Sequence, residues 1–115
     1  MKVVINNDYG GFGLSDEAFE RYLELKGIEF ARVSDKFEST HYYKAGHIDE
    51  DDYYLSPYDI ERTDPFLIQV VEELKEKTNS PYSTLKVIEI PDDIEWEINE
   101  YDGNEWVAEK HRTWS

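Results

Sequence analysis

The sequence has no cysteine, one methionine, four prolines and six glycines among its 115 residues. Without cysteine, neither a disulfide nor a thiolate metal site is available. No apolar run approaches the roughly 20 residues of a membrane-spanning helix, and the opening MKVVINN lacks the apolar core of a signal peptide. We therefore expect a cytoplasmic protein.

Positive charge is also scarce, since 12 lysines and arginines stand against 27 aspartates and glutamates, for a net charge of -15. Such a chain repels phosphate backbones and anionic membrane surfaces, which disfavours direct nucleic-acid or membrane binding. The acidity favours a basic protein, a nucleic-acid-binding protein or a divalent cation as partner. A simpler interpretation, of equal weight, is that the acidity only keeps the protein in solution.

Apolar side chains are sufficient for one core, because 39% of the residues are hydrophobic and 15% are aromatic. A chain of this length is enough for one domain and too short for two. We therefore expect a single domain over residues 1–115.

The first part of the chain has the pattern of a strand, a turn, a helix and a second strand. β-Branched residues predict a strand over residues 2–5. Ser15 is placed to cap a helix that runs to Lys26 and stops at Gly27. Apolar alternation predicts another strand over 28–33, and the connection is long enough for the two strands to pair in parallel.

The second part begins with the clearest helix signal in the chain. Thr63 or Asp64 is the expected N-cap, and Pro65 occupies the first helical position. Asp102-Gly103 is a strong hairpin-turn signal between two alternating segments. We expect strands over residues 85–90, 94–99 and 105–114.

These elements predict an α+β fold with a small mixed sheet of about five strands, two helices on one face and a C-terminal β-hairpin. Residues 34–64 form a long acidic, tyrosine-rich insertion without steady periodicity. Thirty residues of this kind inside a small domain indicate a functional loop, and the tyrosines argue against full disorder. We expect an ordered excursion with a short strand or helical turn inside it.

The insertion supplies the first candidate site, a surface that binds a partner protein. Tyrosine offers a large contact area with little side-chain entropy to lose, and carboxylates attract basic surfaces. The expected contact residues are Tyr42, Tyr43, Asp49, Asp51, Asp52, Tyr53, Tyr54 and Tyr58.

The turn Gly10-Gly11-Phe12-Gly13 supplies an alternative, a small-ligand site between a strand and a helix. It lacks the dinucleotide and P-loop spacing and has no lysine, and Asp16 and Glu17 would repel a phosphate. We prefer the interpretation that these glycines serve the turn geometry. The alternative ligand-binding set is Asn7, Tyr9, Gly10, Gly11, Phe12, Trp106, His111, Arg112 and Trp114.

Catalysis is the weakest interpretation. Carboxylates of the terminal hairpin, such as Glu97, Glu100 and Glu109, are groups that glycosidases use, but nothing in the sequence sets their separation. His47, Asp49 and Asp51 alternate without EF-hand spacing. We therefore assign no catalytic residue, no metal site and no cofactor.

Two stretches, VVINNDYGGFGLSDEA (3–18) and VIEIPDDIEWEINEYDGNEWVAEKHRTW (87–114), resemble a group of small uncharacterised proteins encoded by phages and prophages. The resemblance implies an origin and leaves the activity open. By analogy with small viral accessory proteins, it implies action in the host cytoplasm against a host enzyme or defence protein.

The first functional hypothesis is therefore a non-enzymatic inhibitor that docks on a basic host protein and mimics nucleic acid. The alternative is a sponge for a nucleotide-derived immune signal, stacked on aromatic rings. A carboxylate-dependent hydrolase ranks last. The oligomeric state stays open, including a homo-oligomer.

Overall fold

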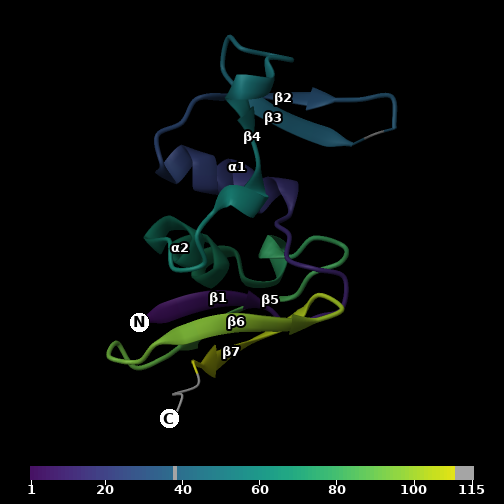
Figure 1. Cartoon of the computed structure of the whole chain (residues 1–115). Coiled ribbons are helices and arrows are strands. Elements are labelled where there is room, and N and C mark those ends of the chain that lie inside the picture. Colours follow the sequence, from purple (N-terminus) through teal and green to yellow (C-terminus); the bar gives the residue numbers. More distant parts are fainter. Residues whose placement is uncertain (38, 111–115) are drawn as a thin grey trace.

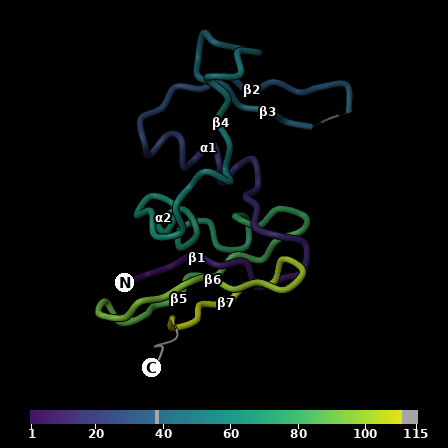
Figure 2. Tube along the Cα trace, in the orientation of Figure 1, coloured from purple at the N-terminus to yellow at the C-terminus, as the bar shows by residue number. Residues whose placement is uncertain are grey.

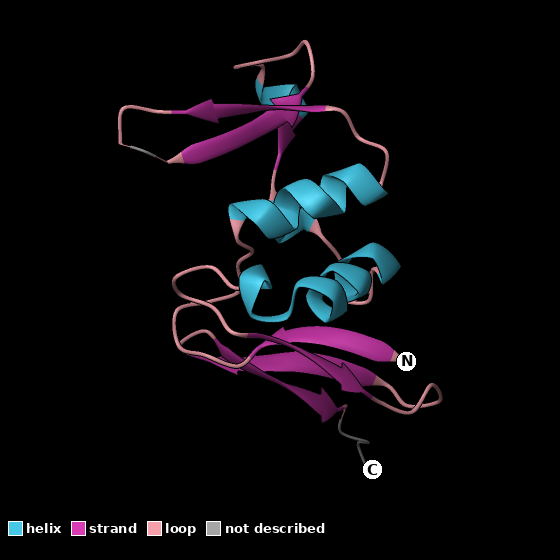
Figure 3. Cartoon of the chain, turned by 180° about the vertical axis from the view of Figure 1, so that it is seen from behind, coloured by secondary structure: helices cyan, strands magenta, loops and turns pink. Residues whose placement is uncertain are grey.

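The protein is a stack of five layers, seen in a computed structural model that describes residues 1–37 and 39–110 (Figure 1). From one end to the other, the layers are the β2–β3–β4 sheet, α1, α2, the β1–β5 pair and the β6–β7 hairpin. Seen from behind, both helices lie between the strands of the two ends (Figure 3). The stack measures 54 × 30 × 27 Å, and its radius of gyration of 15.9 Å exceeds the 13 Å or so typical of 100 residues.

The upper sheet consists of β2 (Phe30–Ser34), β3 (Thr40–Lys44) and β4 (Tyr54–Leu55). All neighbours are antiparallel, with Tyr42 opposite Leu55 and Tyr43 opposite Tyr54. Because successive side chains of a strand point to opposite faces, Tyr42 faces α1 and Tyr43 faces away from it.

Both helices begin where the sequence predicts. The N-cap Ser15 of α1 (Asp16–Leu25) accepts a hydrogen bond from the Ala18 amide at 3.1 Å. The N-cap of α2 (Pro65–Leu74) is Asp64, which accepts from the amides of Phe66 and Leu67. A short 3₁₀ helix, η3 (Lys75–Thr78), continues α2.

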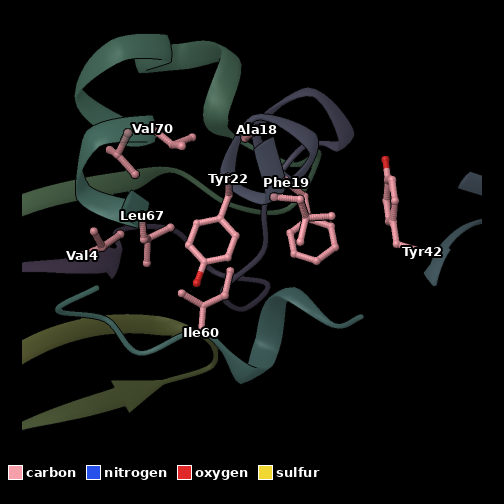
Figure 4. Packing of buried hydrophobic residues seen from close by; sticks show 10 residues of the cluster. Val4, Ala18, Phe19, Tyr22, Tyr42, Ile60, Leu67 and Val70 are labelled. Carbon is pink, nitrogen blue, oxygen red and sulfur yellow. The ribbon is translucent and has the colours of Figure 1, made fainter. Parts of the chain in front are cut away.

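The core lies mainly between the two helices and reaches into the layers on either side (Figure 4). Two of its tyrosines bind carboxylates at its edges: Tyr22 donates to Asp64 at 2.7 Å and Tyr42 to Glu20 at 2.8 Å. The buried cluster is Val4, Ala18, Phe19, Tyr22, Leu23, Tyr42, Ile60, Leu67, Val70 and Val71.

The lower layers join the two ends of the described chain (Figure 2). β1 (Lys2–Asn6) pairs with β5 (Leu85–Glu89), and β6 (Trp96–Tyr101) pairs with β7 (Asn104–Glu109). The side chain of Val4 lies on the face of β1 that belongs to the helical core. Val3 and Ile5 alternate with Val4, so their side chains lie on the second face, where they are buried outside that cluster. The hairpin lies on this second face of β1.

The α+β class is confirmed, but the sheet arrangement differs from the expected one. Residues 1–37 and 39–110 contain seven strands in three antiparallel sheets, where we predicted one mixed sheet of about five strands. The parallel pairing that the connection between the first two strands permits does not occur, because α1 carries the chain to the far side of the helices. β1 therefore pairs with β5, and β2 pairs with β3.

The insertion 34–64 has more regular structure than its sequence shows. It supplies β3 and β4 together with two short 3₁₀ helices, η1 (Asp51–Tyr53) and η2 (Pro57–Asp59), so the expected short strand and helical turn are confirmed. The last predicted strand is present as β7, and its residues from 111 on lie outside the described range. In the described chain, neither helix has the length and apolar character that a membrane crossing requires.

Candidate functional site

The outward face of the upper sheet gathers aromatic side chains from two strands. The rings of Tyr43 on β3 and Tyr54 on β4 meet edge to face, with centroids 5.5 Å apart. His41 lies two residues before Tyr43 and therefore on the same face, with its ring centroid 6.2 Å from that of Tyr54. We call this surface, made of His41, Tyr43 and Tyr54, the tyrosine face.

The loop between β3 and β4 borders the tyrosine face with carboxylates. His47 stacks on Tyr53 with ring centroids 3.7 Å apart, and its Nδ1 lies 2.7 Å from the Glu50 carboxylate. The pKa of the Tyr43 hydroxyl is raised by partial loss of hydration, and then by the negative charges of Asp49 and Asp51. Those two carboxylates therefore act directly on the tyrosine face.

A further carboxylate is held at the other end of β3. Asp35 lies 2.9 Å from Nε2 of His41 and also accepts hydrogen bonds from the amides of Phe37 and Ser39. The hydrogen bond with His41, followed by that from Ser39, lowers the pKa of Asp35. The tyrosine face is thus flanked by fixed negative charge on two sides.

The structure brings most of the predicted contact residues together. Tyr43 and Tyr54 form the face itself, while Asp49, Asp51, Asp52 and Tyr53 lie in the bordering loop. Tyr58 lies on η2 and is 73% exposed.

Tyr42 is the exception among the predicted contacts. Its side chain is 4% exposed and packs edge to face against Phe19 and Phe30. Burial, followed by the hydrogen bond to Glu20, raises the pKa of its hydroxyl. It is a core residue because β3 directs alternate side chains inward, so it does not lie on the outward surface with the other expected contact residues.

Sequence reasoning missed the three residues that complete the surface, His41, His47 and Asp35. The signal for His41 was present in principle, because recognising residues 40–44 as a strand places His41 beside Tyr43. The stacking of His47 on Tyr53 depends on the loop conformation, which no spacing rule encodes.

The glycine-rich turn receives the tip of the C-terminal hairpin. The Gly10 amide donates to the Asp102 carbonyl at 3.0 Å, and a Cβ on Gly103 would lie 2.1 Å from the Gly11 nitrogen. At least the Gly10 amide is therefore already occupied, which supports the interpretation that these glycines serve turn geometry.

The other described members of the alternative ligand set belong to two segments, the glycine-rich turn with the residues beside it and strand β7. Tyr9, Asn7 and Trp106 are exposed, and Phe12 is covered by the Arg62 guanidinium, 3.7 Å from its ring centroid. His111, Arg112 and Trp114 lie outside the described residues. The described members thus lie on the turn and on β7, and one face of the Phe12 ring is already occupied by Arg62.

Among the hairpin carboxylates, those with contacts support the fold. Glu105 binds the Arg62 guanidinium through both carboxylate oxygens and accepts a hydrogen bond from the Asn6 amide. Glu100 accepts a hydrogen bond from the Gly103 amide. Within residues 1–37 and 39–110, no three histidine, aspartate or glutamate side chains gather as a metal site would require.

Comparison with known proteins adds no relative: no family model, no curated protein and no solved structure matches the chain.

Proposed function

We propose that this protein is a non-enzymatic binder that docks the tyrosine face and its acidic border on a basic surface of another protein. The observation that carries the proposal is the contact of Tyr43 and Tyr54 on an outward sheet face, beside the carboxylates of Asp49 and Asp51. Aromatic anchors surrounded by charge are the composition of protein-binding surfaces.

Charge supports the choice of a basic partner. The net charge of -15 attracts a cationic surface over long range, and the carboxylates of the loop concentrate that charge beside the aromatic anchors. Such complementarity speeds association and makes it sensitive to salt.

The two cavities beside β4 have dimensions that suit a partner's side chain. Open cavities of about 170 and 260 Å³ flank β4. Both are smaller than the roughly 300 Å³ at which small-molecule sites begin. At these two cavities, a side chain of a partner fits better than a nucleotide does.

The setting of this function belongs to the same proposal. The terminal segments resemble phage and prophage proteins, and small viral proteins of this kind commonly block host enzymes or defences. A surface of carboxylates can occupy a groove that otherwise binds phosphates. We therefore propose that the protein inhibits a host protein with a nucleic-acid-binding groove.

The test is capture from a bacterial lysate with the full chain, at about 50 mM and about 500 mM NaCl, across which charge screening rises steeply. We expect a basic protein to be retained at low salt and released at high salt, and duplex DNA to compete with it. Tyr54→Ala should weaken retention about tenfold or more, as loss of an aromatic anchor does. Tyr101→Ala is the matched control, because Tyr101 is an exposed tyrosine on β6, whose hairpin lies at the opposite end of the stack (Figure 1).

Retention of nothing at either salt would contradict the proposal, as would retention that Tyr54→Ala leaves unchanged. Native mass spectrometry with cyclic nucleotides tests the sponge directly. A nucleotide mass retained by the wild-type chain would favour the sponge over the binder.

A further inference from the structure

A cavity of about 260 Å³ lies between the N-terminal half of α1 and the segment formed by β3, β4 and η2. Phe19 of α1 and Tyr42 of β3 contribute to its lining and pack edge to face, with ring centroids 5.1 Å apart. Figure 4 shows these two rings approaching each other from the helix and from the strand. His41, Tyr54 and Tyr58 also line the cavity, so five aromatic rings surround one small space.

The charge of this cavity is negative. Among the described residues that line it there is no lysine or arginine, and Asp16 is its one carboxylate. Oδ2 of Asp16 accepts from the Thr40 hydroxyl at 3.2 Å and from Arg32 at 3.4 Å. Arg32 also binds Glu20, so one guanidinium is shared by two carboxylates and the group retains a net negative charge. The Asp16 side chain is 48% exposed and open to a further cation.

The cavity is continuous with the tyrosine face, because Tyr54 and His41 belong to both. A protein docked on that face would therefore have a side chain within reach of the cavity. This position, the aromatic walls and the single carboxylate together specify what kind of side chain fits.

We propose that this cavity receives one arginine side chain of the basic partner, an inference that rests on the proposed function. The aliphatic stem of arginine packs on apolar walls such as Phe19 and Leu55. Its planar guanidinium stacks on tyrosine rings and binds a carboxylate, a combination for which the lysine ammonium is less suited. The volume of about 260 Å³ suits one such side chain.

The test uses a short capped peptide, acetyl-Gly-Arg-Gly-amide, against the same peptide with citrulline, the uncharged isostere of arginine. Amide shifts of the full chain are followed by heteronuclear NMR during titration. We expect the arginine peptide to cause saturable shifts at Thr40, Leu55 and Tyr58, and the citrulline peptide to cause none. A lysine peptide should bind more weakly than the arginine peptide.

Two variants and a control locate the binding. Asp16→Asn and Tyr58→Leu should each weaken the arginine peptide about threefold to tenfold, as loss of an ion pair or of a stacking ring does. Tyr58 is largely exposed, so its replacement tests the cavity without disturbing the core. Glu109→Gln, which removes an exposed charge from the distant hairpin, should have no effect. The inference would be overturned if the citrulline peptide caused equal amide shifts, or if the arginine peptide bound both cavity variants as tightly as the wild-type chain.

The lysate experiment separates this inference from the proposed function. If the arginine peptide fails while the wild-type chain still captures a partner in a Tyr54-dependent way, the cavity is not an arginine site and the binder function stands. If the arginine peptide binds as expected and no partner is retained from the lysate, the arginine site is supported and the proposed binder function is contradicted.

Discussion

Arg62 makes more contacts between layers than its place in an irregular segment would suggest. Its guanidinium donates to both carboxylate oxygens of Glu105, at 2.5 and 2.9 Å, and to the Val4 carbonyl at 3.3 Å. Its own carbonyl accepts the Val4 amide. With Phe12 beneath the guanidinium, one residue joins the segment before α2, the free edge of β1 and the hairpin.

Arg62→Ala should therefore destabilise the protein strongly. The Arg62 and Glu105 side chains are 21% and 10% exposed, so the substitution leaves Glu105 as a nearly buried charge without its partner. We expect a loss of about 2–4 kcal/mol in the free energy of unfolding, near the range for broken buried pairs. Urea unfolding followed by tryptophan fluorescence measures this.

Arg21→Ala is the matched control, since Arg21 pairs with Glu24 and Glu73, whose carboxylates are exposed. The Arg21→Ala substitution should lower the free energy of unfolding by about 1 kcal/mol or less, as the loss of an exposed ion pair does. Equal losses for the two variants would show that Arg62 contributes no more than a surface ion pair.

At the scale of elements, the hairpin depends on how closely its turn approaches the glycine-rich turn. Gly103 has φ 88°, a left-handed conformation, and a Cβ there would lie 2.1 Å from the Gly11 nitrogen. Gly27 has a similar φ of 71° with no heavy atom within 4 Å of the added Cβ. The two positions share the backbone strain and differ in the steric contact.

Gly103→Ala should therefore lower the free energy of unfolding more than Gly27→Ala does. Left-handed backbone alone costs an alanine about 1–2 kcal/mol, and we expect at least about 1 kcal/mol more at Gly103 from the displaced turn. Hydrogen exchange should quicken in β6 and β7 of the Gly103 variant and stay unchanged in α1. A Gly103→Ala protein with native protection in the hairpin would show that the turns can separate freely.

Elements with local signals could be predicted from the sequence. Ser15 and Asp64 cap their helices through bonds to amides two or three residues away, and Asp102-Gly103 turns the hairpin between adjacent strands. Each of these signals lies within the element it starts or closes, so neighbouring residues are enough to find it.

Pairings between distant segments could not be predicted in the same way. β1 meets β5 across most of the chain, and Glu105 meets Arg62 from 43 residues away. In the candidate site, consecutive tyrosines hide the alternation of β3, so Tyr42 and Tyr43 look equivalent until the strand places one inside and one outside. The acidic tyrosine-rich character was visible, whereas the geometry of the surface required the fold.

At the scale of the whole molecule, the net charge of -15 is spread along a stack 54 Å long. Like charges raise the free energy of a folded chain more than that of an expanded one. The elongated shape reduces this repulsion, because it keeps the carboxylates of the two ends far apart.

Salt should consequently stabilise the protein. Raising NaCl from about 20 mM to about 300 mM shortens the Debye length severalfold and should increase the free energy of unfolding by about 1 kcal/mol. The double variant Glu97→Gln, Glu109→Gln removes two exposed charges and should show a smaller increase. A decrease with salt would mean that attractive pairs outweigh the repulsion.

During synthesis, β1 emerges before β5, with which it pairs, and before the hairpin, which covers its second face. The Asn6 amide donates to the Glu105 carboxylate, 99 residues later in the sequence, and the second face of β1 is covered only when the hairpin is present. Contacts so distant in sequence form slowly, because the entropy cost of closing a long loop comes before the stabilising contact is made. The face of β1 that carries Val3 and Ile5 therefore stays uncovered on the ribosome until the hairpin has emerged, and it is the surface on which a nascent-chain chaperone would act.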